Sequence, residues 1–583
     1  MSSTPNTLTP GPAVVDRSLI SAALSDLIGV AENAAVKADP VAFLRALASA
    51  GVGVLQHPLS TVGANYRFLK GLAAASVATG GRAVGLDWAG PISPPPGDQR
   101  FNDPAYRDNP AYFLLAQQYL LVCRLVTELL DAAGLAGIKE TKARFAAQFL
   151  LDAISPTNTL AGNPAAIRRV FDTGGKSVIA GARNMLHDVR HNGGWPSQVD
   201  RSGFEVGVNM AATPGVIVYR SDLIELIQYT PQTPTVHSIP LLFCPAWINK
   251  YYILDLAPGK SLIEWAIQHG HTCFAISYRN PDESMRELGF EDYMFKGPLD
   301  AVRVVREITG AHQVNTLSVC LGGTLTALAL AHHAAIGDDS IRSATLLNTL
   351  TDFSEPGVLG TFSDEPTIKG LEKQMAKQGY LDSEQMARTF SALRANDLIF
   401  AYIANNWLSG NKPPAFDLLA WNEDSTRMPA KMHSQYLRSC YVNNEFAQGE
   451  FKIDSERLDP SLVKADTYVL AAIDDHIVPW TSSYRTTQIL GGTSRFVLST
   501  AGHIAGIVNP PSPKAKHWTN DDLPPDALDW KTGATLQQRT WWEDWTAWIA
   551  GRGGPEIAAP DRHGSDNYPA LEDAPGTYVR TAD

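Results

Sequence analysis

The sequence predicts an α/β protein in which a mostly parallel central sheet follows a helical N-terminal region. Residues 1–203 lack clear strand patterns, whereas strand-like and helix-like segments alternate from residue 215 onward. Such alternation favours parallel strands with helices on both faces of the sheet. A sharp strand–turn–helix motif within the alternating region supports the same fold class. We therefore expect a helical domain at residues 1–203 and an α/β domain at residues 204–583.

Helices are expected throughout the first domain. Apolar periodicity predicts them at residues 19–34, 40–51, 109–133, 139–153 and 164–188. A proline-rich turn at residues 91–97 interrupts the series, and residues 191–201, rich in Gly, Asn and Ser, predict a linker. The total length of 583 residues also favours more than one domain or one enlarged domain.

The α/β domain begins with a predicted strand pair at residues 215–219 and 225–229. Further strands are predicted at residues 241–244, 273–277, 314–319, 344–347, 467–472 and 495–499, and helices at residues 262–269, 299–309, 324–336 and 539–550. Residues 352–449 are an insertion too long for a simple connection. Because it interrupts the sheet after the central motif, it predicts a cap or lid over a site.

Composition excludes several classes of protein. A net charge of −12 argues against a nucleic-acid-binding surface. The five cysteines include no CxxC pair, which fits a reduced, cytosolic protein and predicts no metal site. The N-terminus lacks the pattern of a signal peptide. The most apolar helical stretch, residues 112–130, contains Gln, Arg and Glu, so we expect no transmembrane segment.

Cys320 is the candidate nucleophile. It lies in Ser318-Val319-Cys320-Leu321-Gly322-Gly323, between a predicted strand and a predicted helix. This is the context of a nucleophile elbow, with a thiol in place of the usual hydroxyl. Taken alone, the motif is equally compatible with a buried core thiol. An acyl group taken from a thioester onto a cysteine remains an activated thioester, so a cysteine here suits acyl transfer rather than hydrolysis.

Two further residues complete a candidate triad. Asp475 follows the predicted strand 467–472, and His503 follows the predicted strand 495–499. The order nucleophile, acid, histidine, with each residue after a strand, is that of the α/β-hydrolase fold. Asp474 is the alternative acid. The neighbouring His476 precedes an apolar run and is expected to form a structural hydrogen bond.

An acyl-transfer site also needs at least two N–H donors for the tetrahedral oxyanion. The backbone N–H of Leu321 is expected to be one, because it follows the nucleophile. The second is expected from the loop after the strand 241–244, near Trp247 or Ile248, and Ile248 is our candidate. His503 would take the proton of Cys320, and Asp475 would orient the His503 ring or act with it on an incoming hydroxyl.

Several sequence strings resemble polyhydroxyalkanoate synthases, enzymes that polymerise 3-hydroxyacyl-CoA into a storage polyester. The similar strings are RFNDP at 100–104, PAWINKYYILDL at 245–256, YRNPD at 278–282, SVCLGG at 318–323, FDLLAWN at 416–422, DHIVPW at 475–480, GHIAG at 502–506 and APGTYV at 574–579. The resemblance runs from about Phe101 to the C-terminus. Two positions depart from the family pattern, with Ser318 in place of the usual Gly and Ala246 where Pro is frequent.

The resemblance implies an α/β-hydrolase catalytic domain with a lid and a helical N-terminal domain. It transfers the roles of nucleophile, acid and base to Cys320, Asp475 and His503. It also associates binding of coenzyme A with Arg394 and Asn444. It further implies a homodimer in the cytoplasm, bound to polyester granules and using no cofactor, since coenzyme A belongs to the substrate. The length resembles class I, and parts of the lid resemble the medium-chain class, so the preferred acyl length stays open.

The expected reaction is polymerisation of (R)-3-hydroxyacyl-CoA with release of CoA through an acyl-Cys320 thioester. One alternative is a thioesterase or polyester depolymerase on the same scaffold, which would release free hydroxy acid. Another is a non-catalytic granule-associated protein. Both the polymerase and the hydrolase need the triad, and they differ in whether water reaches the acyl group.

Overall fold

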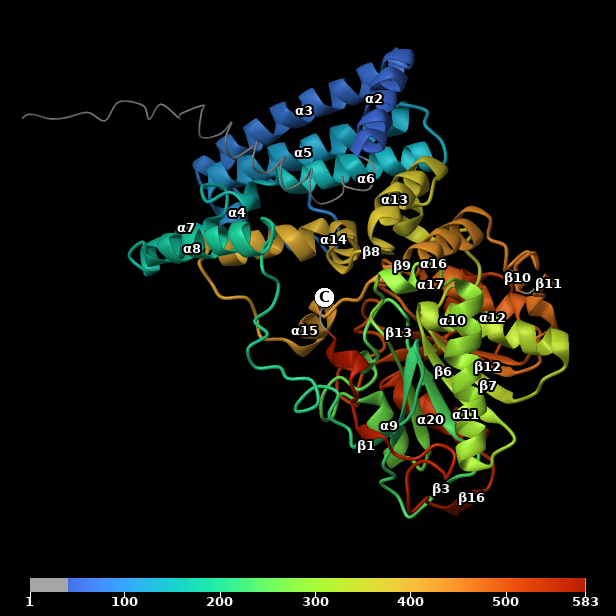
Figure 1. Cartoon of the computed structure of the whole chain (residues 1–583). Helices are drawn as coiled ribbons and strands as arrows, with labels where there is room; N and C mark the ends of the chain where they lie inside the picture. The colour runs from blue at the N-terminus through green and yellow to red at the C-terminus, as the bar shows by residue number, and fades with distance from the viewer. Residues whose placement is uncertain (1–39, 454, 582–583) are drawn as a thin grey trace, which may run out of the picture.

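The computed structural model describes residues 40–453 and 455–581. A helical N-terminal region covers one end of an α/β domain, and helices of the insertion lie between the two (Figure 1). The helix expected at residues 19–34 lies outside the described residues. Three other expected helices are present as α2 (Pro40–Gln56), α5 (Pro110–Ala132) and α6 (Ile138–Ala153).

The longest helix of this region, α3 (Pro58–Ala83), is absent from the sequence prediction. Its glycines and alanines give no stripe of large apolar residues. A side chain at Gly71 would collide with Leu121 on α5, and one at Gly81 would collide with the ring of Trp88. Small residues therefore let α3 pack closely on α5, a role that sequence periodicity does not reveal.

The helix predicted at residues 164–188 is two helices, α7 (Pro164–Asp172) and α8 (Lys176–His191). Gly174 and Gly175 separate them with φ angles of 56° and 82°. These left-handed conformations end α7 and reset the direction of the chain. Two short helical segments, α4 (Ala105–Asp108) and η1 (Pro156–Asn158), complete the region.

All eight predicted strands are present in one eleven-stranded sheet with the order β15-β14-β13-β12-β7-β6-β4-β5-β2-β1-β17. The strands are β1 (Gly215–Arg220), β2 (Ile224–Tyr229), β4 (Leu241–Cys244), β5 (Cys273–Tyr278), β6 (Val314–Val319), β7 (Ile341–Leu347), β12 (Asp466–Ala472), β13 (Ser494–Ser499), β14 (His517–Thr519), β15 (Thr535–Gln537) and β17 (Glu572–Asp573). The central strands from β5 to β13 pair in parallel, and the strands at both edges pair antiparallel. This arrangement confirms the predicted fold class.

Helices bury both faces of the sheet. On one face, α9 (Leu262–Gln268) and α20 (Trp541–Ala550) enclose a cluster that includes Trp541 and Trp545. On the other, α10 (Phe290–Met294), α11 (Asp300–Thr309) and α12 (Leu321–Ile336) enclose a second cluster. The central strand β6 is buried along its whole length, as a strand covered on both sides must be. The carboxyl ends of the central strands are thereby held at fixed positions.

Shorter elements complete the α/β domain. They are β3 (Thr235–His237) with β16 (Glu556–Ala558), β10 (Lys452–Ile453) with β11 (Glu456–Arg457), α17 (Trp480–Tyr484), α18 (Thr486–Ile489) and α19 (Ala527–Gly533). The insertion contains α13 (Glu365–Gln378), α14 (Ser383–Leu393), α15 (Asp417–Glu423), α16 (Ala430–Gln435), η8 (Tyr436–Val442) and the strand pair β8 (Tyr380–Leu381) and β9 (Met428–Pro429).

Helix α5 departs from one expectation. By length and composition it is apolar enough to cross a membrane, with a mean hydropathy of 1.4 over 18 residues. The Gln, Arg and Glu residues of α5 led us to expect no transmembrane segment. The composition of the helix does not by itself exclude one. In the structure α5 packs against α3 and α6, and Phe113, Leu120 and Leu121 are buried in that packing. A third of its most apolar stretch is buried in the structure.

The helical region contacts the insertion through a buried ion pair and aromatic rings. The Lys142 ammonium on α6 lies 2.6 Å from Asp364 and donates to the Thr367 hydroxyl at 2.9 Å, both at the start of α13. The Phe145 ring packs edge-on against Phe362 with centroids 5.5 Å apart. The position of the insertion therefore depends on α6.

We expect Asp364→Asn to loosen this contact. Lys142 is buried, and removing one partner of a buried ion pair costs about 3 kcal/mol or more. The measurement is hydrogen exchange of the α13 amides, which should quicken by about a hundredfold. Thr367→Val is the matched control and should cost less, about 1.5 kcal/mol, because it keeps the ion pair and removes only the hydroxyl that accepts from Lys142 and donates to Asp364. Unchanged α13 exchange in Asp364→Asn would show that the ion pair does not hold the helix.

Candidate active site

Cys320 occupies a strained turn between β6 and α12. Its φ and ψ angles are 52° and −121°, a conformation that costs a non-glycine residue about 1–3 kcal/mol. Its backbone N–H donates to the Leu347 carbonyl of β7 at 2.9 Å, which holds the turn to the sheet. The side chain thus stands at the N-terminus of α12, where the helix dipole favours a negative charge.

The turn after Cys320 needs small side chains because neighbouring segments pack closely against it. A Cβ at Gly322 would collide with the Cys244 and Pro245 carbonyls, and one at Gly323 would collide with the Thr349 side chain. The departure at Ser318 is accommodated, because its buried hydroxyl is 2.7 Å from the Thr326 hydroxyl. The elbow is therefore packed directly against the loop that follows β4.

Asp475 and His503 lie together after β12 and β13. The His503 Nδ1 is 2.6 Å from the Asp475 Oδ2. The other carboxylate oxygen of Asp475 accepts from the backbone N–H groups of Ile477 and Val478 at 2.8 and 2.9 Å. Asp474 is exposed, so the structure pairs Asp475 and not the alternative acid with the histidine.

His503 is held in its charged form. Burial opposes the charge, but the negative charges of Asp475 and Cys320, with hydrogen bonds to both, raise the pKa of His503 to about 10. Because Nδ1 is bonded to Asp475, the other side of the ring serves Cys320. An imidazolium beside the sulfur favours the thiolate.

The raised pKa of His503 also affects stability. A histidine in an unfolded chain titrates near pH 6.5. Since the folded pKa is higher, the proton stabilises the folded chain fully below about pH 6.5. This contribution is lost as the pH rises through about 10.

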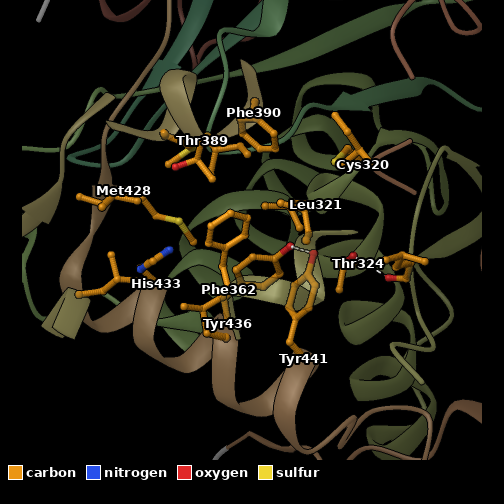
Figure 2. A pocket seen from close by; sticks show the side chains of 18 of the residues that line it. Cys320, Leu321, Thr324, Phe362, Thr389, Phe390, Met428, His433, Tyr436 and Tyr441 are labelled. Carbon is orange, nitrogen blue, oxygen red and sulfur yellow. Dashed lines mark hydrogen bonds between the residues drawn. The ribbon is translucent and has the colours of Figure 1, made fainter. Parts of the chain in front are cut away.

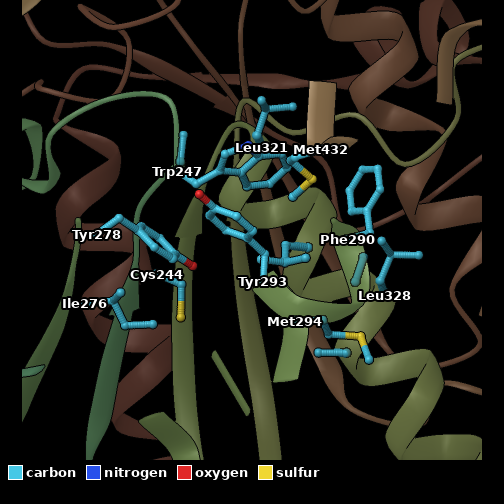
Figure 3. Close-up of a cluster of buried hydrophobic side chains, with 14 of the residues drawn as sticks. Cys244, Trp247, Ile276, Tyr278, Phe290, Tyr293, Met294, Leu321, Leu328 and Met432 are labelled. Carbon is cyan, nitrogen blue, oxygen red and sulfur yellow. The ribbon is translucent and has the colours of Figure 1, made fainter. Parts of the chain in front are cut away.

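Two backbone N–H groups are available for an oxyanion. Leu321 is the first residue of α12, and Ile248 follows β4; both line the same cavity as Cys320. In the part of the chain that the structure describes, neither N–H is bonded to a protein acceptor. Trp247 points instead into the core, with its ring 5.8 Å from Phe290 and 6.0 Å from Tyr293 (Figure 3). Its burial fixes the loop that carries Ile248.

Lys250 ties this loop to two distant segments. Its buried ammonium donates to the Val579 and Thr581 carbonyls at 2.6 and 2.9 Å, and lies 3.1 Å from Asp424 of the insertion. The Lys250 carbonyl accepts from the Trp421 indole at 2.8 Å. The C-terminal segment and the insertion therefore both support the loop that would provide an oxyanion donor.

Cys320 opens into a mostly apolar cavity of about 120 Å³ (Figure 2). Fourteen of its 21 lining residues belong to the insertion 352–449, among them Phe362, Phe390 and Met428. The insertion thus forms the greater part of the wall that separates the sulfur from solvent. By the measure in which one water needs about 10–15 Å³, the cavity holds roughly ten non-hydrogen atoms.

Comparison with known proteins places this chain in a family. Residues 97–266 match the model of the poly-beta-hydroxybutyrate polymerase (PhaC) N-terminus, and residues 239–510 match the alpha/beta hydrolase fold. A poly(3-hydroxyalkanoate) polymerase subunit of Cupriavidus necator is 43% identical over 490 residues, 83% of each chain. A polymerase of Methylorubrum extorquens is 43% identical over 494 residues, which are 84% of this chain and 82% of that one. One from Ectopseudomonas oleovorans is 40% identical over 489 residues, which are 84% of this chain and 87% of that one.

The chain belongs to the poly(3-hydroxyalkanoate) polymerase family. This confirms the resemblance inferred from the strings around Cys320, Asp475 and His503.

Arg394 and Asn444, which the family resemblance associates with coenzyme A, lie outside the lining of the Cys320 cavity. Arg394 ends α14 and pairs with Asp397. It lines a separate hollow with Arg100 of the helical region. Its charge acts on His476, whose pKa is lowered to about 4 chiefly by burial. The contact of Arg394 with coenzyme A stays a prediction.

Asn444 joins the two ends of the insertion. Its side-chain oxygen accepts from the Phe353 N–H at 2.8 Å, and its NH₂ donates to Asp352 at 2.8 Å. Burial raises the pKa of Asp352, but bonds from Ser354 and Asn444 outweigh it and keep the pKa low. With φ at 49°, Asn444 uses a left-handed conformation that asparagine tolerates. Its amide is engaged within the protein, and a role toward coenzyme A stays a prediction.

Sequence reasoning missed three polar side chains of the cavity. They are His433, Tyr436 and Tyr441, contributed by α16 and η8. The Tyr436 and Tyr441 hydroxyls lie 3.1 Å apart. The insertion has no clear periodicity, so the sequence does not show which of its side chains face Cys320. Only the packing of the insertion onto Cys320 brings these three residues to the site. The structural hydrogen bond expected for His476 is also not seen at its Nδ1, which is buried without a partner among the described residues.

Metal chemistry was not expected from the cysteine and histidine spacing. Within residues 40–453 and 455–581, no group of three or more His, Cys, Asp and Glu side chains is arranged to hold a metal ion.

The charge on His503 predicts how Cys320 reacts. Alkylation of Cys320 by iodoacetamide at pH 7 should be about tenfold faster in the wild type than in His503→Gln, because the imidazolium persists to about pH 10 and stabilises negative charge on the sulfur. The measurement is the rate of carbamidomethylation of Cys320 by mass spectrometry. Equal rates in the two proteins would show that His503 does not act on the sulfur.

We expect Asn444→Gly to loosen the contact between the two ends of the insertion. The glycine accepts the left-handed backbone but leaves the Phe353 N–H without its partner and removes one of the donors to Asp352, at a cost of about 1–3 kcal/mol. Limited proteolysis within residues 352–449 should quicken by about tenfold or more. Asn443→Ala, at an exposed neighbouring position, is the control. Equal cleavage of both variants and wild type would show that Asn444 does not hold the insertion.

Proposed function

We propose that this chain polymerises (R)-3-hydroxyacyl-CoA into polyhydroxyalkanoate, with release of CoA, through a thioester at Cys320. The observation that carries the proposal is a Cys320–His503 pair, oriented by Asp475, that opens into a mostly apolar cavity. Membership of the poly(3-hydroxyalkanoate) polymerase family supports the reaction class.

In the acylation step, the Cys320 thiolate attacks the thioester carbonyl carbon of the substrate. The N–H groups of Leu321 and Ile248 donate to the tetrahedral oxyanion. The bond between carbon and the sulfur of CoA then breaks. The proton on His503 passes to the departing CoA thiolate, which leaves as the free thiol. The products of this half-reaction are acyl-Cys320, neutral His503 and CoA.

Acylation prepares His503 for the second step. The thiolate is one of the groups that raise the pKa of His503, and it is absent once the sulfur is acylated. The neutral imidazole, still oriented by Asp475, accepts the proton of the 3-hydroxyl of another unit. That oxygen attacks the acyl-Cys320 carbonyl, an oxoester forms and the thiolate is restored beside the imidazolium.

The energy for growth comes from the exchange of one thioester for one oxoester in each cycle, provided that water stays out. The apolar wall contributed by the insertion supports this exclusion. The lining of the cavity beside Cys320 is mostly apolar, so we assign the cavity to the acyl group and not to the charged CoA. The reaction uses no cofactor beyond the CoA of the substrate. We further propose that the enzyme acts as a homodimer on polyester granules in the cytoplasm.

The test is the purified chain with 3-hydroxybutyryl-CoA, followed by CoA release and polymer turbidity. Wild type should give both. Cys320→Ala should give neither, and Cys320→Ser should give no polymer, because a serine hydroxyl is not ionised by His503 and its acyl form is a poorer donor. Cys123→Ser, on α5 outside the cavity, is the control and should keep both signals. CoA release with free hydroxy acid and no polymer would establish a thioesterase or depolymerase instead.

A further inference from the structure

One polar side chain in the Cys320 cavity has no partner. Most of the lining is apolar, and each of the other uncharged polar side chains is bonded within the protein: Thr324 to the Leu350 carbonyl, Thr389 to the Gln385 carbonyl, Gln385 to Gln374, and Tyr436 to Tyr441. His433, on α16, forms no side-chain hydrogen bond with the described part of the chain. It is only 8% exposed, so the ring lies almost entirely within the protein.

The two ring nitrogens of His433 differ. Nδ1 is sealed inside the protein without a partner, whereas Nε2 is not among the sealed atoms. Burial lowers the pKa of His433 to about 4, so the ring is neutral at physiological pH and carries one proton. A sealed N–H without an acceptor is rarer and more costly than a sealed lone pair. The favoured tautomer therefore carries its proton on Nε2 and presents a donor to the cavity.

The position of this donor limits what it can meet. Cys320 and His433 lie on opposite sides of the group of lining side chains (Figure 2). On the proposed function, the cavity is occupied by the acyl group on Cys320 after CoA has left. With room for roughly ten non-hydrogen atoms, the cavity reaches beyond the 3-carbon of a single unit. The next polar group along a polyester is the ester carbonyl that joins the second unit, and a carbonyl is an acceptor only.

We propose that His433 Nε2–H donates a hydrogen bond to the ester carbonyl of the unit that follows the acyl group on Cys320. The inference rests on the proposed function and adds a ligand to it: an acyl chain that already contains an ester. His433 is then a specificity-determining residue that favours a growing chain over a single monomer as occupant of the cavity.

The physical reason is the buried donor itself. A monomer leaves the Nε2–H unpaired in an apolar cavity, whereas an esterified chain satisfies it. One hydrogen bond of this kind changes a rate or binding constant by about tenfold. The enzyme should therefore be acylated more efficiently by a chain with the ester carbonyl than by an isosteric chain without it.

The test compares three acyl donors in single-turnover CoA release. They are 3-hydroxybutyryl-CoA, its ester-linked dimer as the CoA thioester, and a dimer analogue with an ether in place of the ester. Wild type should use the ester dimer about tenfold more efficiently than the ether dimer. In His433→Phe this ratio should fall to about one, whatever the change in the monomer rate. His433→Gln, which retains a donor, should keep part of the ratio, and Cys123→Ser, on α5 outside the cavity, should keep all of it.

Three results would overturn the inference. The first is a wild-type ratio near one, which needs no variant. The second is a ratio unchanged in His433→Phe. The third is an equal loss for the monomer and both dimers, which would place the acceptor on CoA or give His433 a purely structural role. Failure of wild type to release CoA from any donor would overturn the proposed function as well.

Discussion

The contact of the His503 ring with Asp475 on one side and Cys320 on the other is the interaction on which the remaining site depends. Burial alone would discharge the imidazole, and its two neighbours Asp475 and Cys320 raise its pKa instead. The sheet makes this possible, because β6, β12 and β13 end at one edge and carry the three side chains in adjacent loops. The strained backbone of Cys320 is tolerated there because β7 and the loop after β4 hold it on two sides.

The insertion completes the site by enclosing it. Most of the cavity wall belongs to residues 352–449, so water exclusion depends on how these residues are held. Asn444 joins the two ends of the insertion to one another, and Lys142 fixes the start of α13 from the helical region. The Phe362 ring both lines the cavity and packs on Phe145 of α6. The helical region therefore has a direct structural connection to the wall of the Cys320 cavity.

The loop after β4 shows a similar dependence on distant segments. Trp247 holds it from the core side, and Lys250 holds it from the side of the C-terminal segment. An oxyanion donor is useful only when it is positioned before the charge develops. The contacts of Lys250 with Val579 and Thr581 give the C-terminal segment a role in that positioning, although it lies far from Cys320 in the sequence.

The sequence by itself determined the fold class, the eight main strands and the three candidate catalytic residues that the structure brings together. Strand periodicity and the elbow motif can each be recognised from a few neighbouring residues. The order of Cys320, Asp475 and His503 along the chain can likewise be recognised without the tertiary structure. It missed α3, whose close packing on α5 depends on glycines that only the partner helix explains. It also missed His433, Tyr436 and Tyr441, and it did not foresee that Asn444 closes the base of the insertion. These outcomes were decided only by the tertiary structure, because they depend on which distant surfaces meet when the insertion packs on the sheet and the helical region.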